Sequence, residues 1–190
     1  MPGKLIDLEG IDNCGKTTQA YLVSAWLNSR KQPSVVTKEL TTPVGRLIKW
    51  YFGQESFPPI LKVLLFAGDR FIRQVKEVSP AINKGKIVIA DRWVSSAVVY
   101  RAVESISTDY VIKVNDFALK PDVIIILDVP AALAVERGKL AKRPCPYSLD
   151  FLKKARLEYL RIAETVGAIV IDGSLPKDQV TQEILRLLKQ

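Results

Sequence analysis

The feature that most constrains this chain is a glycine-rich segment at positions 10 to 17. It reads Gly-Ile-Asp-Asn-Cys-Gly-Lys-Thr and fits the pattern G-x-x-x-x-G-K-[ST]. Glycines let a backbone curl around an anion, and the amides at the start of a helix point toward that anion. The segment follows the apolar residues 5–9 and precedes residues 16–29, whose apolar positions recur with helical spacing. This order of strand, loop and helix is the setting that a phosphate-binding P-loop requires.

Short runs rich in isoleucine and valine alternate with longer segments of helical spacing. The runs are residues 5–9, 34–38, 87–91, 123–128 and 168–172. The helical segments are residues 16–29, 43–52, 59–84 with a break or bend near Pro80, 108–119, 130–137, 149–166 and 176–188. Strands that are apolar on both faces and alternate with helices indicate a covered parallel sheet. We therefore predict an α/β fold, a doubly wound five-stranded parallel sheet with helices on both faces, in a single domain spanning residues 1–190.

The ends of the predicted strands suggest where chemistry takes place. Ligands of such sheets bind beyond the carboxyl ends of the strands. Acidic residues lie at or near these ends: Glu9, Glu39, Asp91, Asp128 and Asp172. A further acidic residue, Asp7, interrupts the first strand, and the sequence offers no reason for it.

P-loops serve GTPases, motor ATPases and small-molecule kinases. The chain has no Asn-Lys-x-Asp segment of the kind that recognises guanine, and at 190 residues it is short for a motor domain. It contains no histidine, which excludes Ser-His-Asp and Cys-His nucleophiles and metal sites built on histidine. Two cysteines, Cys14 and Cys145, are too few for a disulfide framework, and the apolar residues 123–127 are too few to cross a membrane. We expect a cytoplasmic protein without a membrane partner.

Positive charge is concentrated in one stretch. The chain carries 28 basic residues against 20 acidic ones, a formal net charge of +8. Between positions 137 and 161 only Asp150 and Glu158 are acidic. The basic residues of that stretch are Arg137, Lys139, Lys142, Arg143, Lys153, Lys154, Arg156 and Arg161. Either a solvated helix face or a phosphate-rich partner explains such a stretch.

Four segments, taken together, resemble the thymidylate kinase family. They are the P-loop with Thr18 and Gln19, residues 65–70 (Leu-Phe-Ala-Gly-Asp-Arg), residues 91–96 (Asp-Arg-Trp-Val-Ser-Ser) followed by Tyr100, and residues 121–129 followed by Glu136 and Arg137. They occur in the same order as in the family. The resemblance implies a P-loop kinase fold with a short lid, and a reaction in which ATP and dTMP give ADP and dTDP with Mg²⁺. It also implies a homodimer formed through the helix around residues 61–75.

The resemblance implies a role for individual residues of these segments, and two basic residues outside them, Lys38 and Arg143, are added as candidates for positive charge that the family supplies elsewhere. The catalytic residues would be Asp12, Lys16, Arg92 and Arg143. ATP would bind Gly10, Ile11, Asp12, Asn13, Cys14, Gly15, Lys16, Thr17, Thr18 and Arg137. The acceptor dTMP would bind Asp12, Lys38, Phe66, Arg70, Arg92, Ser96 and Tyr100. Mg²⁺ would bind Thr17 directly and Asp91 through water.

The chemistry of these side chains suits such a kinase. The attacking oxygen of a monophosphate is already anionic near neutral pH, so alignment and charge neutralisation matter more than a strong base. By resemblance, Phe66 would stack on the pyrimidine, Arg70 would donate to the base O4, and Tyr100 would exclude a 2′-hydroxyl. Plainer roles are core packing for Phe66 and Tyr100, a surface ion pair for Arg70, and a helix cap for Asp12.

Some positions depart from the family pattern. Many members carry an arginine for the acceptor phosphate after the second strand, where this chain offers only Lys38 or Arg46, and lysine lacks the bidentate geometry. Trp93 stands where tyrosine is usual, and Arg101 where glutamine is common. Because these changes border the acceptor site, a related acceptor such as dUMP stays open.

The lid is expected at about residues 138–148. Gly138 and Pro144 bracket it, which favours a loop rather than a continuing helix. Asn13 and Cys14 of the P-loop cannot supply positive charge to the transferred group, so the lid would have to supply it. The candidates are Arg143 or Arg137, with Lys142 assisting. The alternative is a solvated lid whose charges only attract the nucleotide.

Two rival functions stay open. A deoxynucleoside acceptor is a neutral alcohol and would favour a carboxylate base at the end of the first strand, where Glu9 lies. A nucleic-acid-responsive ATPase would use the basic stretch on a polynucleotide, although few aromatic residues accompany that stretch. We therefore expect small-molecule substrates and no nucleic-acid partner.

Overall fold

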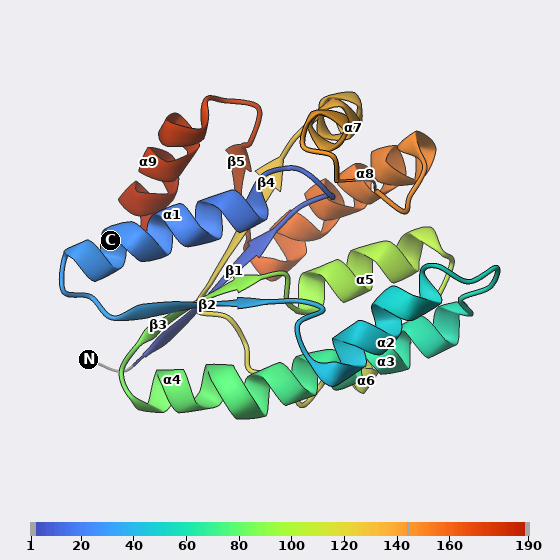
Figure 1. The fold of residues 1–190 in the computed structure, drawn as a ribbon, viewed down its shortest axis with the longest axis horizontal. Coiled ribbons are helices and arrows are strands. Elements are labelled where there is room, and N and C mark those ends of the chain that lie inside the picture. The colour runs from blue at the N-terminus through green and yellow to red at the C-terminus, as the bar shows by residue number, and fades with distance from the viewer. Residues whose placement is uncertain (1–2, 144, 189–190) are drawn as a thin grey trace.

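The structure, a computed structural model, describes residues 3–143 and 145–188, which contain one five-stranded parallel sheet. Its strands are β1 (Lys4–Glu9), β2 (Ser34–Lys38), β3 (Ile87–Asp91), β4 (Val123–Asp128) and β5 (Ile169–Asp172). They lie in the order β2-β3-β1-β4-β5 (Figure 1). Every predicted strand is confirmed, with its ends placed within one residue.

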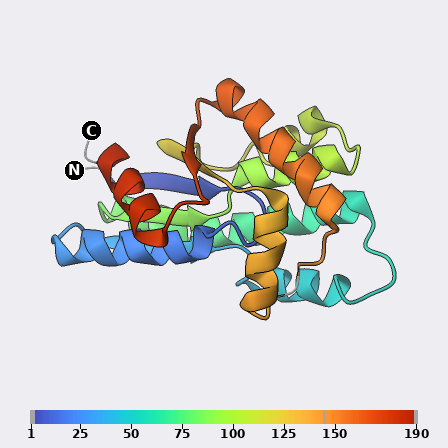
Figure 2. The same cartoon turned by 90° about the horizontal axis from the view of Figure 1, so that it is seen from above.

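Helices cover both faces of this sheet. They are α1 (Lys16–Ser29), α2 (Pro43–Tyr51), α3 (Pro59–Arg73), the π-helical turn η1 (Gln74–Val78), α4 (Ser79–Asn83), α5 (Val94–Val103), α6 (Thr108–Val114), α7 (Ala131–Leu140), α8 (Leu149–Val166) and α9 (Lys177–Leu187). Helix α1 packs against α9. Helix α4 contacts β3, and α8 contacts β4 and β5. Figure 2 shows α1 and α8 on opposite sides of the strands. The predicted doubly wound fold is confirmed.

Strand β1 lies at the centre of the sheet and is buried on both faces. On one face Ile6 and Leu8 join Ala20 and Val23 of α1 in the larger core cluster. On the other, Leu5 joins a smaller cluster that includes Trp93. Because β1 leads directly into the P-loop, this burial on two sides fixes the position of the loop.

Helix α5 was not predicted from the sequence. Four of its residues, Val94, Val98, Val99 and Val103, are β-branched and lower helix propensity. No side chain next to α5 in sequence caps its start. Instead Glu9 Oε1 accepts hydrogen bonds from the amides of Trp93 at 2.9 Å and Ser96 at 3.0 Å. The cap therefore comes from the end of β1, which local sequence patterns do not reveal.

Other helix ends also differ from the prediction. The helical segment predicted over residues 59–84 is confirmed as α3, η1 and α4, which follow one another directly. The break or bend predicted near Pro80 corresponds to the turn η1, which ends just before that proline. The helix predicted over residues 108–119 ends at Val114, where the Asn115 side chain becomes a partner of Arg70. The predicted end of α7 at residue 137 is wrong, because the helix continues through Gly138 to Leu140.

Candidate active site

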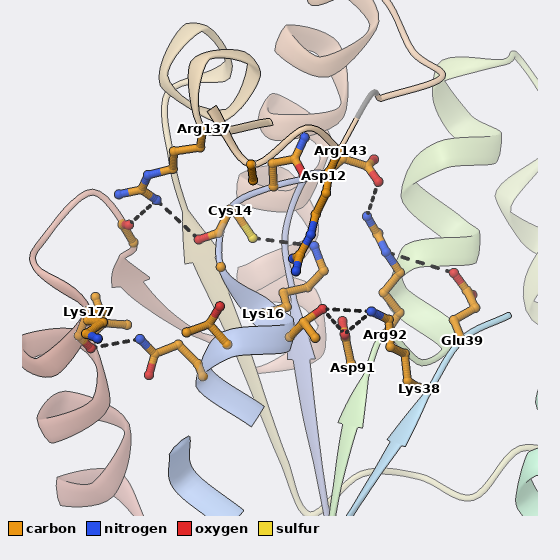
Figure 3. A pocket seen from close by; sticks show the side chains of 18 of the residues that line it. Asp12, Cys14, Lys16, Lys38, Glu39, Asp91, Arg92, Arg137, Arg143 and Lys177 are labelled. Atoms are coloured by element: carbon orange, nitrogen blue, oxygen red, sulfur yellow. Dashed lines mark hydrogen bonds and ion pairs between the residues drawn. The ribbon is translucent and has the colours of Figure 1, made fainter. Parts of the chain in front are cut away.

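Two pockets adjoin at the carboxyl ends of β1, β2 and β3. The P-loop pocket has a volume of about 530 Å³, and P-loop residues 12–18 form part of its wall (Figure 3). The aromatic pocket has a volume of about 390 Å³, with Phe52, Phe66, Tyr100 and Tyr147 in its wall. The residues that line both pockets are Asp12, Glu39, Leu40 and Arg92.

The P-loop wraps closely around the Lys16 side chain. Its ammonium donates to the carbonyl oxygens of Gly10 at 2.9 Å and Ile11 at 2.7 Å. Gly10 has a φ of 135°, and a Cβ there would lie 2.6 Å from the carbonyl oxygen of Leu127, so only glycine fits. Residues 12–19 line the pocket, whereas Gly10 and Ile11, which were also predicted to bind ATP, do not.

Thr17 and Asp91 meet at one corner of the P-loop pocket. The Thr17 hydroxyl donates to Asp91 Oδ2 at 2.5 Å, and Lys38 Nζ lies 3.2 Å from Thr17 Oγ1 and 3.9 Å from Asp91 Oδ2 (Figure 3). A hydroxyl and a carboxylate are the oxygen ligands that Mg²⁺ takes from proteins when phosphates and water supply the rest. Within residues 3–143 and 145–188, no cluster of three or more His, Cys, Asp or Glu forms a metal site. Thr17 and Asp91 are the two residues of this corner that would hold such a metal.

Arg92 stands between the two pockets with its guanidinium held on several sides. It donates to the hydroxyls of Ser96 at 2.9 Å and Tyr100 at 3.0 Å. It also lies 3.1 Å from Asp12 Oδ1 (Figure 3). Burial lowers the pKa of Arg92, but nearby oxygens, led by those of Tyr100 and Asp12, raise it well above its usual value. The side chain is therefore a fixed, permanent cation.

Asp12 faces the same boundary as a carboxylate. Burial raises the pKa of Asp12, but Arg92 and Lys16 lower it by more, so it lies below its usual value. Tyr100 also donates to Asp12 Oδ2. In the neighbouring wall, burial raises the pKa of Glu39, which lies 3.6 Å from Arg70 and 4.0 Å from Arg92.

The predicted acceptor residues do not all line the aromatic pocket. Phe66, Ser96 and Tyr100 do, together with Arg92. Lys38 lines only the P-loop pocket. Arg70 lines neither pocket, because its side chain is buried and donates to Asn115 Oδ1 and to the Trp93 carbonyl oxygen at 2.8 Å.

Arg101 and Tyr147 are among the residues of the aromatic pocket that were missing from the predicted site. Arg101 is 3% exposed and lines the pocket with its guanidinium 3.0 Å from Glu104 and 5.8 Å from the centre of the Phe66 ring. The change from the family's common glutamine was a signal for it. Tyr147, which stacks on Phe151 at 4.3 Å, lies outside the four recognised segments and had no such signal.

The two candidate lid arginines differ in their contacts. Arg137 Nη1 donates to the carbonyl oxygens of Gly173 at 2.8 Å and Cys14 at 3.5 Å, and its Nη2 to that of Ser174 at 3.3 Å. Figure 3 shows the Arg143 side chain reaching into the P-loop pocket, which it lines. Arg137 therefore joins loops around the pocket, while Arg143 faces its interior.

Gly138 packs against the P-loop instead of ending α7. A Cβ at this position would lie 2.3 Å from Asn13 Nδ2 and 3.1 Å from the carbonyl oxygen of Arg143. This close approach, and not a loop conformation, is the reason for the glycine. Ala141 and Arg143 of the segment after α7 line the P-loop pocket. Pro144, the other predicted bracket of the lid, lies outside the described residues.

Glu9 lines neither pocket. Its Oε1 accepts from two amides at the start of α5, and its Oε2 accepts from the hydroxyls of Ser96 and, at 2.9 Å, Tyr159. A carboxylate that accepts four hydrogen bonds in a buried position acts as a structural cap. It has no open oxygen for a substrate hydroxyl.

A family model described as thymidylate kinase matches residues 8–184. This chain belongs to the thymidylate kinase family. The "Probable thymidylate kinase" of Pyrococcus abyssi is 33% identical over 199 aligned positions, covering 100% of this chain and 97% of the relative. That of Pyrobaculum aerophilum is 35% identical over 189 positions, covering 97% and 96%. The "Probable thymidylate kinase 1" of Saccharolobus solfataricus is 34% identical over 189 positions, covering 98% and 97%.

Membership of the thymidylate kinase family confirms the resemblance seen in the sequence and makes the chain a kinase. The matched residues 8–184 contain all the residues that line the two pockets and all of the segment after α7. In the part of the chain that the structure describes, no helix combines the length and apolar character needed to span a membrane.

Proposed function

We propose that this chain transfers the γ-phosphoryl group of ATP to dTMP, giving ADP and dTDP, as a single P-loop kinase domain. The observation that carries the proposal is the boundary shared by the two pockets. Asp12 and Arg92 line both, so a donor in one pocket and an acceptor in the other would meet at these side chains. The thymidylate kinase family supplies the substrate class.

The P-loop pocket suits ATP along its whole length. The amides at the start of α1 and the Lys16 ammonium favour the phosphates. Leu175 and Val180 add apolar surface at the side formed by the loop after β5 and by α9, next to Arg137. A flat purine fits against such a wall, which assigns that side to adenine and the P-loop to the triphosphate.

Mg²⁺ belongs at the corner where Thr17 and Asp91 meet. When bound there, it would neutralise phosphate oxygens of the donor. The Lys38 ammonium beside these two residues adds a second positive charge at the donor phosphates. We therefore assign Lys38 to the donor side. Arg46, the other basic residue considered after β2, is exposed and lines neither pocket.

The aromatic pocket suits a pyrimidine deoxynucleotide. The Phe66 ring offers a stacking face. Tyr100 stands between Asp12 and Arg92, beside the expected position of the sugar. Arg101 reaches the base side of the pocket, where the family resemblance had placed Arg70. We assign base recognition to Phe66 and Arg101, and the acceptor phosphate to Arg92 and Ser96.

The reaction needs alignment more than proton transfer. The attacking phosphate oxygen of dTMP already carries negative charge, so no side chain has to remove a proton. Arg92 attracts this oxygen, and Asp12 fixes the Arg92 guanidinium by an ion pair of 3.1 Å. Lys16 and Arg143, from opposite sides of the P-loop pocket, neutralise the charge that spreads over the transferred group. Lys142 contributes further positive charge from the lid.

The structure favours this acceptor over the rivals. A deoxynucleoside would need a base for its hydroxyl, and the four hydrogen bonds to Glu9 leave that carboxylate without this role. For a polynucleotide, three arginines of the basic stretch are already engaged. Arg156 pairs with Asp128 at 2.6 Å and 2.7 Å, Arg137 contacts carbonyl oxygens, and Arg143 faces the pocket. The other five basic residues of the stretch are exposed.

We also propose a cytoplasmic homodimer. One side of α3 and η1 exposes Ile60, Leu64, Phe71 and Val75, an apolar stripe at helical spacing that a second copy would cover. Both cysteines are free thiols, which suits a reducing compartment where nucleotides are made.

A monophosphate panel tests the proposed reaction. With ATP and Mg²⁺, dTMP should react fastest and give one dTDP for each ADP, and dUMP, dCMP, dAMP, dGMP and UMP should follow. Release of inorganic phosphate without dTDP, or stimulation by DNA or RNA, would contradict the proposal. An equally fast reaction with thymidine would assign the chain to the deoxynucleoside rival.

A further inference from the structure

Arg92 occupies an unusual backbone conformation. Its φ is 75°, in the left-handed region that residues other than glycine seldom adopt. Such a residue costs free energy and persists only where its surroundings hold it, and these residues cluster at functional sites. The surroundings that hold Arg92 therefore decide where its guanidinium points.

Hydrogen bonds hold every backbone polar group of Arg92 and Trp93. The Arg92 amide donates to the Leu8 carbonyl oxygen at 3.1 Å, and the Trp93 amide donates to Glu9 at 2.9 Å. The two carbonyl oxygens accept from buried guanidinium groups of α3. Arg73 Nη2 lies 3.2 Å from the Arg92 oxygen, and the Trp93 oxygen is held in the same way by Arg70.

Arg73 has no other evident task. Its side chain is 0% exposed and lines neither pocket, and within the described residues no carboxylate oxygen lies within 4.0 Å of it. A buried cation without a close counter-charge lowers the stability of the fold, and an apolar side chain would fill the same space with a smaller loss of stability. What the guanidinium does provide is a donor to the carbonyl oxygen of Arg92.

Arg73 is itself held in a fixed orientation. Its Nε donates to Thr37 Oγ1 at 3.1 Å, and the Thr37 hydroxyl donates onward to Glu77 Oε2. Its guanidinium also lies 5.3 Å from the centre of the Trp93 ring. Glu77 belongs to η1, the turn that begins directly after Arg73. Widened π-helical turns of this kind are frequent at functional sites.

We propose that Arg73 is a positioning residue for Arg92. By holding the Arg92 carbonyl oxygen, it keeps the left-handed backbone that aims the Arg92 side chain at Asp12 and at the boundary between the pockets. Arg73 touches no substrate in this arrangement and acts only through Arg92. The inference rests on the proposed role of Arg92 in binding the acceptor phosphate.

A double-mutant cycle tests this coupling. The variants are Arg73→Met, Arg73→Lys, Arg92→Met and the double variant Arg73→Met/Arg92→Met, with Lys76→Met on the exposed side of η1 as the matched control. A displacement of the Arg92 guanidinium by ~1 Å should lower kcat with dTMP about 100-fold in Arg73→Met. Arg73→Lys should recover part of this loss because an ammonium can still donate to the carbonyl oxygen. The Kd for ATP, measured by equilibrium binding, should not change.

The decisive result is non-additivity. If Arg73 acts through Arg92, then Arg73→Met should cause no further loss of kcat/KM in the Arg92→Met background. Losses that multiply in the double variant would overturn the inference, as would an Arg73→Met enzyme with normal kcat per folded molecule and only a lower Tm. If Arg73→Met does not fold, Thr37→Val, which removes the Arg73 Nε acceptor, takes its place in the same cycle. Full activity of Arg92→Met alone would instead reject the role of Arg92 in the proposed function.

Discussion

Arg137 Nη1 donates to the carbonyl oxygen of Gly173 at 2.8 Å and so joins α7 to the loop that follows β5. The same guanidinium also contacts the P-loop at Cys14. Three chain segments that are far apart in sequence therefore meet at one side chain on the rim of the P-loop pocket. We therefore propose that Arg137 shapes the nucleotide site and that Arg143 supplies the transition-state charge.

Substitutions of the two lid arginines should therefore change different kinetic parameters. Arg143→Ala should lower kcat by at least ~100-fold with little change in the KM for ATP, because it removes charge stabilisation of the transferred group. Arg137→Ala should mainly raise the KM for ATP and lower Tm by a few degrees, because backbone contacts of both loops are lost. Steady-state kinetics and thermal unfolding of the two variants check this. If both variants raise only KM, the catalytic role of the lid is rejected.

Lys16→Ala should nearly abolish phosphoryl transfer, with a fall in kcat of ~1000-fold or more. The ammonium is the P-loop's own cation, and in the structure it is 5% exposed and held by two carbonyl oxygens of that loop. Circular dichroism should show a folded protein. Substantial turnover by a folded Lys16→Ala enzyme would be incompatible with the P-loop assignment.

Base selection should depend on Arg101. The intact enzyme should prefer dTMP over dUMP by a modest factor, since a buried methyl group is worth only about 1–3 kcal/mol. Arg101→Met should raise the KM for dTMP about tenfold or more while kcat changes less, because it removes a donor to the base and no group near the transferred phosphoryl. Lys49→Met, which changes another cation of the same pocket, is the control. Faster reaction of the intact enzyme with dCMP or a purine monophosphate would reject the assignment of the base to Phe66 and Arg101.

Asp7 makes stability depend on pH in a direction opposite to that of most carboxylates. Burial, then the neighbouring Glu9, raise the pKa of Asp7 well above its usual value. The folded state therefore keeps this proton while the unfolded chain loses it. As pH rises from the usual aspartate pKa to the raised one, the contribution of Asp7 to the free energy of unfolding must fall.

Asp7→Asn cannot lose a proton and should remove this dependence. We expect a Tm a few degrees above that of the parent protein at about pH 8, with the difference shrinking at about pH 4. Thermal unfolding across this range, with Asp109→Asn on α6 as an exposed control, measures it. A constant loss of stability at every pH would show that Asp7 forms favourable contacts as a carboxylate.

The sequence predicted the parts of this fold that depend on local patterns. All five strands and the P-loop followed from short apolar runs and one motif, because buried parallel strands and phosphate loops have local signatures. Helix α5 did not, since its cap is Glu9, a residue more than 80 positions earlier whose role appears only when β1 and β3 pair. Asp7 was noticed as an anomaly, but its burial beside other charges is a tertiary property.

In the candidate site, too, some features follow from local sequence motifs and others depend on tertiary contacts. The motif residues Lys16 and Thr17 line the P-loop pocket, and Arg92, which the sequence assigned to the acceptor phosphate, lines both pockets. The predictions that depended on side-chain direction fared differently. Arg70 lies on the expected helix, but its guanidinium turns to the Trp93 carbonyl oxygen, while Arg101 from α5 enters the pocket. Sequence spacing places a residue on an element and does not decide which of two nearby acceptors its side chain reaches.

The segment after α7 contributes Arg143 to the wall of the P-loop pocket and Tyr147 to that of the aromatic pocket. These residues are four positions apart, so the chain between them spans at most about 14 Å. Under the proposed function, a movement of Tyr147 out of the aromatic pocket would carry Arg143 with it, away from the donor phosphates. ATP bound without an acceptor would then face water with one cation fewer around it. We therefore expect slow hydrolysis of ATP in the absence of dTMP, and a departing product of one pocket would loosen the hold on the product in the other.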